Sequence, residues 1–430
     1  LQKKDMPIRE LEPKAIWEKF DEILKIPRPS KKEEKIIHFL QEFGRRNNLE
    51  TLIDDAGNVL IRKKAFPGKE KTPIIILQSH IDMVCEKNSD VTFNFDTDAI
   101  KAYIEEGWVK AKGTTLGADD GIGIAAQLAI LESDNIEHGP LECLFTVDEE
   151  TGLTGAFNLS PDFLTGKILI NLDSEDEGEI FIGCAGGIDT LAYFEYTEKP
   201  ANSLNIGYQI KIGGLTGGHS GDDIHKGLGN SVKLMTRLLW KLDQEVSIRI
   251  HKFEGGNLRN AIPRESEAII LIKKQHESKF QQLLQEFEKT VKYEFRHTEK
   301  KLNVSETRLL QLPQTVINKK TQKRLIRALY SCPNGVIAWS QDLDGLVETS
   351  TNLASVKFIN SNKILVTTSQ RSSVESQKNN VAAMVRNVFE LAKSKVVHTD
   401  GYPGWTPNPD SPILQIAVDL YKKRFNEEPI

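Results

Sequence analysis

The chain of 430 residues is long enough for two or three domains, and its hydrophobic and charged fractions of 39% and 27% are ordinary for a globular protein. Its net charge of −5, with lysine and arginine spread along the chain, leaves no basic stripe, so we expect no nucleic-acid partner. No apolar run approaches the roughly 18 residues that span a bilayer, and no signal-peptide pattern is apparent, so we expect a cytoplasmic protein without a membrane partner.

The first part of the chain alternates helix and strand signals. A helical pattern runs over residues 10–42, in which Ser30 with Glu33 three positions later resembles a capping box. Short runs rich in isoleucine, leucine and valine then alternate with helical stretches as far as Asp173, as the buried strands of an α/β domain do. We therefore predict a mixed, mostly parallel sheet with helices on both faces.

The pattern changes near Gly186. Segments of period-two hydrophobicity, such as NIGYQIKIGG and SEAIILIKK, mix with helical stretches at residues 231–242 and 279–292. This mixture indicates an antiparallel sheet covered by helices, and no internal repeat is apparent. We predict an α/β catalytic domain interrupted by an α+β lid domain, with the catalytic domain at residues 1–186 and 398–430 and the lid at 187–397.

Four polar side chains stand where apolar runs begin or end. His80 follows PIIILQS, Asp119 precedes GIGIAAQLAI, Glu150 follows LECLFTVDE, and Asp173 follows KILINL. The carboxyl ends of parallel strands lie on one edge of a sheet, so residues far apart in sequence converge there. One imidazole and three carboxylates suit zinc or a similar cation, and acids able to bridge favour two metals.

Taken alone, each of these motifs has a plainer interpretation. The pair His80 and Asp82 is weak evidence, although Asp82 would hold the imidazole in the metal-binding tautomer. Asp119 before a helix could be a capping residue, and TVDEETG could be a solvated acidic loop. Together they predict a hydrolytic metal site. Of the adjacent Glu149 and Glu150, one can bind a metal while the other faces the metal-bound water.

The strings LQSHIDMV, GTTLGADDGIGIA, LFTVDEETGLTGA, NLDSEDEG and GGLTGGHSGDDI resemble those of the Xaa-His dipeptidases. These are co-catalytic zinc peptidases related to carnosinase and peptidase T, and the resemblance covers essentially the whole chain. It implies two zinc ions, which Mn²⁺ or Co²⁺ can replace. By this resemblance His80 and Asp173 bind one zinc, Glu150 binds the other, and Asp119 bridges both.

The resemblance also implies roles around the metals and in the lid. Glu149 would be the general base, Asp82 the partner of His80, and the bond from Asp119 to Asp120 would be cis. Within the lid, His219 would stabilise the oxyanion and reach a partner subunit's site, which implies a homodimer joined through the lid. A histidine in a glycine-rich loop, judged without the family, is more often a turn residue.

Two further lid residues resemble the family's substrate clamp. Asn260 in NLRNAIP and Arg371 in SQRSS occupy these positions. Arg371 would pair with the terminal carboxylate of a dipeptide substrate, although a lone arginine is usually a solvated surface group. The family's last zinc-ligand histidine would come after Ile430, because His398 has the wrong surroundings. We expect that the chain lacks its C-terminal segment, the alternative being a weakened second metal site.

These observations predict a zinc dipeptidase that hydrolyses unblocked dipeptides, preferably Xaa-His. The histidine preference rests on the resemblance alone. A broader aminopeptidase, tripeptidase or deacylase with the same metal pair is an alternative, and a non-catalytic metal-dependent binding protein is another. The presence of Glu149 argues against the last, because a binding protein needs no base beside the metal-bound water.

Overall fold

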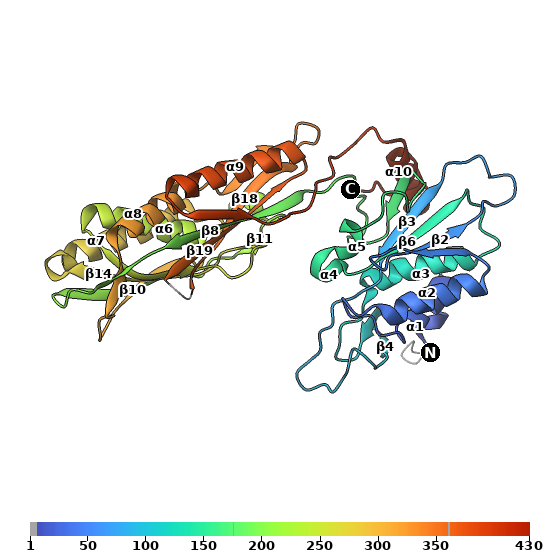
Figure 1. Cartoon of the computed structure of the whole chain (residues 1–430), viewed down its shortest axis with the longest axis horizontal. Coiled ribbons are helices and arrows are strands. Elements are labelled where there is room, and N and C mark those ends of the chain that lie inside the picture. Colours follow the sequence, from blue (N-terminus) through green and yellow to red (C-terminus); the bar gives the residue numbers. More distant parts are fainter. Residues whose placement is uncertain (1–6, 175, 360–361) are drawn as a thin grey trace. The chain divides into compact units, whose positions relative to one another are not determined.

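The computed structural model describes residues 7–174, 176–359 and 362–430, and the chain divides into two compact units (Figure 1). The first unit comprises Leu1–Glu179 with Phe425–Ile430, and the second comprises Ile180–Arg424. The predicted domain limits at residues 186 and 397 stay a prediction. Within the described residues, no helix is long and apolar enough to cross a membrane.

The first unit is built on a five-stranded sheet. In spatial order its strands are β1 (Glu50–Ile53), β2 (Val59–Lys63), β6 (Leu141–Thr146), β3 (Ile75–His80) and β7 (Ile168–Asn171). Strands β6, β3 and β7 are parallel, whereas β1 and β2 pair antiparallel with their neighbours. This confirms the predicted mixed α/β sheet. It also brings the carboxyl ends of three strands to one edge.

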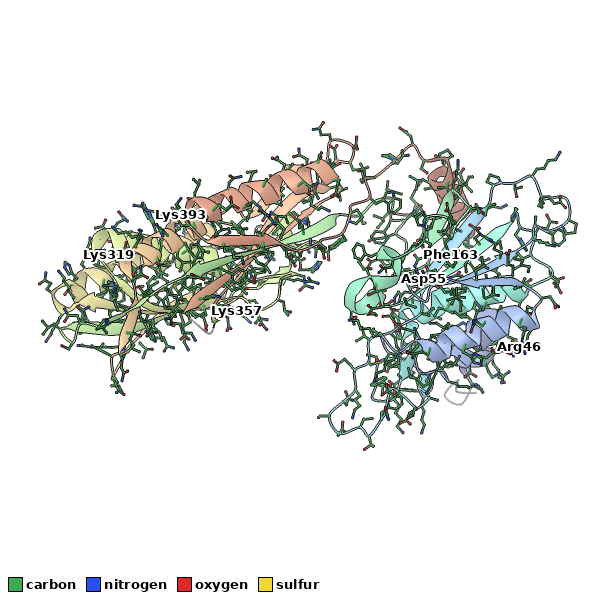
Figure 2. The ribbon with its side chains drawn as sticks, viewed as in Figure 1. Arg46, Asp55, Phe163, Lys319, Lys357 and Lys393 are labelled. Carbon is green, nitrogen blue, oxygen red and sulfur yellow. The ribbon has the colours of Figure 1, made fainter. Side chains whose placement is uncertain are left out.

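Three helices pack against one face of this sheet: α1 (Lys14–Ile23), α2 (Glu34–Arg46) and α3 (Ala118–Glu132). Side chains alternate between the two faces of a strand, so Val59 and Ile61 of β2 join the core beneath these helices. Leu60, between them, joins a smaller cluster on the other face, against which Phe163 packs (Figure 2). The remaining elements are η2 (Ile8–Glu10), the hairpin β4 (Ala102–Glu105) and β5 (Trp108–Ala111), α4 (Glu149–Gly152) and α5 (Thr154–Phe157).

The predicted helical stretch at residues 10–42 is broken, and the capping box within it is wrong. Pro27 and Pro29 interrupt the helical pattern between α1 and α2, because proline and the residue before it disfavour helix. Helix α2 begins at Glu34 without a side-chain cap. The Ser30 hydroxyl instead donates to Asp82 (2.7 Å), and Glu33 accepts from the Lys31 backbone N–H (2.9 Å).

The second unit is a nine-stranded antiparallel sheet with helices, as predicted for an α+β insert. Its main helices are α6 (Ser231–Glu245), α7 (Glu277–Glu294), α8 (Lys319–Ser331) and α9 (Glu375–Leu391). The sheet strands are β8 (Gly186–Glu195), β10 (Asn205–Gly213), β12 (Arg249–Gly255), β14 (Ser266–Lys273), β15 (Asn303–Arg308), β17 (Gly335–Trp339), β18 (Val347–Ile359), β19 (Lys363–Ser372) and β20 (Lys395–His398). Short elements complete it: β9 (Glu198–Pro200), β11 (Gly218–His219), η3 (Ile224–Lys226), β13 (Ala261–Ile262), η4 (Lys274–His276) and β16 (Thr315–Ile317). Helix α10 (Pro412–Phe425) ends at the chain position where the second unit gives way to the first.

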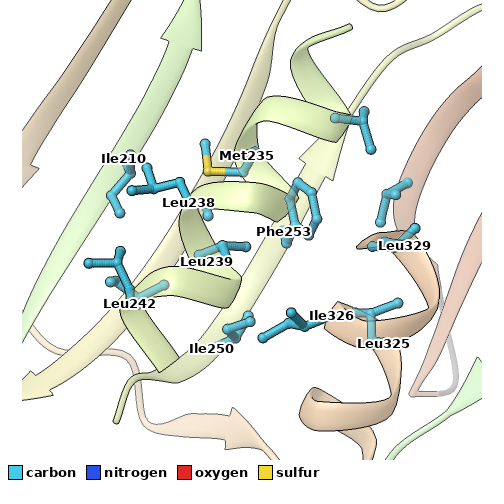
Figure 3. Packing of buried hydrophobic residues seen from close by; sticks show 14 of the residues in the cluster. Ile210, Met235, Leu238, Leu239, Leu242, Ile250, Phe253, Leu325, Ile326 and Leu329 are labelled. Atoms are coloured by element: carbon cyan, nitrogen blue, oxygen red, sulfur yellow. The ribbon is translucent and has the colours of Figure 1, made fainter. Parts of the chain in front are cut away.

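One buried core joins this sheet to its helices. Figure 3 shows side chains of α6 packed against residues of the sheet and of α8. Met235, Leu238, Leu239 and Leu242 come from α6, Ile250 and Phe253 from β12, and Leu325, Ile326 and Leu329 from α8. All of these side chains are at most 2% exposed. Apolar residues recur every three or four positions along α6, which places them on the one face of the helix that packs on the sheet.

The second unit contains a repeat that the sequence does not reveal. One half runs β10-α6-β12-β14-α7-β15 and has the spatial strand order β15-β10-β14-β12. The other half uses β8, α8, β18, β19, α9 and β20, with the order β20-β8-β19-β18. In each half, the four strands numbered along the chain lie in the sheet in the order fourth, first, third, second. Antiparallel pairing of β12 with β18, at Gly255 and Val356, joins the halves into one sheet.

Candidate metal centre

The four predicted metal ligands all lie in the first unit, at the ends of strands or in the first turns of helices. His80 is the last residue of β3, and Asp173 lies two residues beyond β7 on the neighbouring parallel strand. Asp119 lies in the first turn of α3, and Glu150 lies in the first turn of α4, just after β6. All four segments reach the carboxyl edge of the sheet. The predicted convergence of these positions is therefore present in the fold.

His80 stands at the centre of this group. Its Nε2 lies 2.8 Å from Asp119 Oδ1 and 3.8 Å from Asp173 Oδ1. Ligand atoms of His80, Asp119 and Asp173 all lie within 4.8 Å of one another, and the same holds for His80, Glu149 and Glu150. Four carboxylates thus surround one buried imidazole, which is only 1% exposed. One imidazole with four carboxylates is a donor set that fits divalent cations.

Asp82 orients His80 and the start of α4 through hydrogen bonds on the side away from the proposed metal ligands. Its Oδ1 lies 3.2 Å from Nδ1 of His80, and burial would raise the pKa of Asp82, but hydrogen bonds from His80, Glu149 and Ser30 lower it to about 2. An ionised carboxylate only accepts, so Nδ1 carries the proton and Nε2 is turned toward the metal ligands. Asp82 also accepts the backbone N–H groups of Glu149 (3.0 Å) and Glu150 (3.2 Å). It therefore aligns β3 with the start of α4.

The electrostatics of the site favour a bound cation. Burial alone would lower the pKa of His80, but hydrogen bonds to Asp119 and Asp82 and the charge of Asp173 raise it to about 11. Burial, with the charge of Asp173 adding to it, raises the pKa of Glu149 to about 7. Crowded carboxylates of this kind repel one another, and a divalent cation relieves the repulsion. The residues present therefore fit the metal that the sequence predicts.

The first turn of α3 contains a further acidic residue, Asp120. The peptide bond between Asp119 and Asp120 is cis, as the family resemblance implies. The Asp120 carboxylate accepts the backbone N–H of His80 (3.1 Å) and that of Gly123 (3.1 Å). Asp120 thus anchors the end of β3 to the first turn of α3. The sequence does not reveal this role of Asp120, because an acid at the start of a helix is also common in ordinary caps.

A second acidic cluster lies behind the first and consists of Glu33, Asp82 and Asp148, all at most 6% exposed. Its oxygens are already engaged by donors. Asp148 accepts from the hydroxyl groups of Thr151 and Thr154, and Glu33 accepts from the Asp148 backbone N–H (3.0 Å). Since these hydrogen bonds satisfy buried carboxylates, we assign the cluster to support of the α4 turn.

The three predicted lid residues belong to the second unit. β11 pairs with β13, which sets His219 opposite Ala261, and the Ser220 N–H donates to the Asn260 carbonyl (2.8 Å). A Cβ on Gly221 would lie 3.1 Å from Arg371 Nη1 and 3.2 Å from His219 Cε1, so the arginine and histidine flank this glycine. The structure thus brings positions 219, 260 and 371 together within one unit.

Two features of this lid cluster bear on ligand binding. His219 Nδ1 lies 2.6 Å from Asp222 Oδ2, a contact that orients the imidazole ring. The buried Nε of Arg371 has no hydrogen-bond partner among the described residues. Buried guanidinium nitrogens are normally paired, so an anionic group at this place would satisfy it.

Comparison with known proteins agrees with this arrangement. Residues 206–299, which span the first half of the second unit, match the peptidase dimerisation domain of the M20 family. The chain is 39% identical over 422 residues to the cytosol non-specific dipeptidase of Escherichia coli K12, covering 98% of this chain and 87% of that protein. The aminoacylhistidine dipeptidase of Vibrio alginolyticus superposes with a TM-score of 0.92 at 41% identity, covering 99% of this chain and 86% of that one.

A more distant structure shares the fold alone. The aminopeptidase PepT of Bacillus cereus superposes with a TM-score of 0.53 at 18% identity, covering 98% of this chain and 84% of that one. The near-full-length relatives carry the assignment, because they combine about 40% identity with coverage of 98% and 99% of this chain. The chain belongs to the M20 family of metallopeptidases, as a member of its aminoacylhistidine dipeptidases, also called cytosol non-specific dipeptidases.

Proposed function

We propose that this protein hydrolyses unblocked dipeptides, preferably Xaa-His, in the cytoplasm. The observation that carries the proposal is the convergence of one imidazole and four carboxylates on the carboxyl edge of the catalytic sheet. The dipeptidase names of the relatives support the substrate class, and the word cytosol in one of them supports the location. The predicted catalytic segments, residues 1–186 and 398–430, and the predicted lid, residues 187–397, are part of the same proposal.

The proposed centre holds two divalent cations, zinc in the first instance, with Mn²⁺ or Co²⁺ as substitutes. His80 and Asp173 would hold one cation, Glu150 the other, and Asp119 would bridge them. When bound, such a pair polarises the scissile carbonyl and makes water more acidic. Asp82 would keep the His80 imidazole oriented, because its carboxylate accepts the Nδ1 proton.

Proton transfer is assigned to Glu149. Its position in the first turn of α4, beside Glu150, aims a second carboxylate at the centre. Burial raises the pKa of Glu149 to about 7, so its carboxylate can accept a proton from water near neutral pH and return it to the leaving amine. This carboxylate would supply both proton transfers that peptide hydrolysis requires.

The lid residues are proposed to bind the substrate. Arg371 would pair with the terminal carboxylate of the dipeptide, which would satisfy its buried Nε. His219, oriented by Asp222, would donate from Nε2 to the developing oxyanion, and Asn260 would contribute to the same clamp. This assignment explains why three sequence-distant residues gather around the turn at Gly221.

A substrate panel tests the proposed activity. With zinc-loaded protein, we expect kcat/KM for Ala-His to exceed that for Ala-His-Ala and for N-acetyl-histidine, because the near-full-length relatives are named as dipeptidases. The measurement is steady-state hydrolysis of the three compounds under one condition. Preference for the acylated compound would favour a deacylase, and preference for the tripeptide a tripeptidase. Binding without any turnover would favour the non-catalytic alternative.

The homodimer joined through the lid is also a proposal. It is supported by the match of residues 206–299 to a peptidase dimerisation domain. Sedimentation velocity of the purified protein is expected to give twice the mass of one chain over the micromolar range. A single-chain mass at all concentrations would contradict the dimer and would require His219 to act within its own chain.

A further inference from the structure

Arg28 lies beneath the metal centre, in the segment between α1 and α2, and is only 2% exposed. Its Nη1 donates to the carbonyls of Ile81 (3.1 Å) and Asp82 (2.6 Å), and its Nη2 donates to the carbonyl of Gly117. Ile81 directly follows His80, and Gly117 stands two residues before Asp119. One guanidinium therefore joins the two backbone segments that carry the histidine and the proposed bridging aspartate.

Because the guanidinium group is rigid, these hydrogen bonds can hold the two backbone segments at a fixed distance. Its donors form a planar fork with fixed angles, so hydrogen bonds made at both ends of the fork set the separation of the two segments. The separation matters because His80 Nε2 and Asp119 Oδ1 lie only 2.8 Å apart. A shift of either segment would move one donor relative to the other, and metal affinity depends strongly on such outer-sphere support.

The two glycines of the segment GADDG, residues 117–121, leave space for the Arg28 side chain. A Cβ on Gly117 would lie 2.7 Å from Arg28 Nη2, and a Cβ on Gly121 would lie 2.8 Å from the same atom. Gly117 also has a φ of +69°, a backbone conformation that side chains disfavour. Both glycines of the loop thus leave room for the guanidinium on either side of Asp119 and Asp120.

The charge of Arg28 also suits its place. Burial lowers its pKa to about 10, against the opposing effects of Asp82, Asp120 and Asp119, so the group remains charged at neutral pH. Since its hydrogen bonds reach backbone carbonyls, it offsets the negative charge of the site while leaving the proposed ligand oxygens available. Burying an arginine is costly unless its donors are paired, and three hydrogen bonds to backbone carbonyls offset part of that cost.

We propose that Arg28 is a positioning residue for the metal centre: it holds the segment after His80 and the turn before Asp119 at the spacing that cation binding needs. The proposal rests on the proposed metal site. It does not place Arg28 in contact with metal or substrate. Its consequence is that loss of the guanidinium weakens metal binding in a protein that is still folded.

Lys233 provides a matched control. It is a partly buried cation of the second unit whose Nζ donates to the backbone carbonyls of Leu329 (2.9 Å), Tyr330 (2.8 Å) and Cys332 (2.8 Å). Replacement of Lys233 by methionine removes a comparable set of hydrogen bonds from α6 and α8. It leaves the residues around His80 unchanged. A general loss of stability would therefore appear in both the Lys233 and Arg28 variants.

The test is a zinc titration of metal-free protein in competition with a chromophoric chelator, for wild type, Arg28→Met, Arg28→Lys and Lys233→Met. We expect Arg28→Met to bind zinc about 10- to 100-fold more weakly, the range typical of lost outer-sphere support. Arg28→Lys should show a smaller loss, because an ammonium keeps the charge but lacks the fork. Lys233→Met should have a lower Tm and unchanged zinc affinity. The visible spectrum of the Co²⁺-loaded protein should change only in the Arg28 variants.

Wild-type zinc affinity in folded Arg28→Met overturns the proposal, and so does an equal loss in Lys233→Met. If circular dichroism shows Arg28→Met to be unfolded, Arg28→Lys replaces it, because lysine keeps the charge but lacks the planar fork. That variant is expected to bind zinc more weakly, and unchanged affinity counts against the role. Failure of wild type itself to bind zinc would instead refute the proposed metal centre.

Discussion

Replacing Glu149 with glutamine is expected to lower kcat for Ala-His by about 100- to 10,000-fold, the usual contribution of a general base. Glutamine keeps the size of the side chain but cannot accept a proton from water. The zinc content and KM should stay near the wild-type values, because Glu150 and not Glu149 is the proposed ligand. The measurement is steady-state hydrolysis together with the metal content of the same preparation.

Glu86→Gln is the control for this change, since Glu86 is an exposed glutamate of the same unit. It should leave kcat unaltered. Undiminished turnover in Glu149→Gln would remove Glu149 from proton transfer and weaken the case for hydrolysis at this centre. Loss of zinc together with activity would make Glu149 a ligand, which the group of His80, Glu149 and Glu150 within 4.8 Å allows geometrically.

Replacing Asp119 with alanine is expected to remove the bridge between the two proposed cations. At least part of the bound zinc should be lost, and kcat/KM should fall by about 1000-fold or more. That magnitude follows because metal ions contribute several kcal/mol to transition-state stabilisation and about 1.4 kcal/mol corresponds to a tenfold change. The measurements are zinc content after dialysis and hydrolysis of Ala-His with and without added zinc.

Asp55→Ala is the matched control, because Asp55 is an exposed aspartate of the first unit (Figure 2). It should retain full zinc content and activity. Restoration of Asp119→Ala activity by moderate zinc would show that Asp119 contributes to affinity alone. Full zinc content with full activity would exclude a bridging role and leave His80, Asp173 and Glu150 as the remaining candidates.

The candidate site was largely predictable because its signals are local. A short apolar run followed by a polar residue marks the carboxyl end of a buried strand, and parallel strands bring such ends together. His80 and Asp173 are therefore placed by rules that need only neighbouring residues. The roles of individual side chains at the site remain predictions, and the variants above test them.

The support of the site was not predictable in the same way. Ser30 and Glu33 match a capping box, yet their side chains interact with Asp82 and with the backbone of residues 31 and 148. Arg28 gave no signal, since its acceptors are backbone carbonyls at residues 81, 82 and 117. Every residue has a backbone carbonyl, so the residue types at positions 81, 82 and 117 do not reveal that these carbonyls accept hydrogen bonds from Arg28. Only the folded structure shows such contacts.

The sequence by itself determined the two kinds of sheet, the order of the elements and the positions of the polar residues at strand ends. Those properties follow from hydrophobic period and from turn residues, which act over a few positions. Tertiary structure alone decided the repeated halves of the second unit and the support beneath His80. Equal strand orders can be built from unlike side chains, because a sheet needs only alternating apolar residues, while buried hydrogen bonds need partners brought from distant segments.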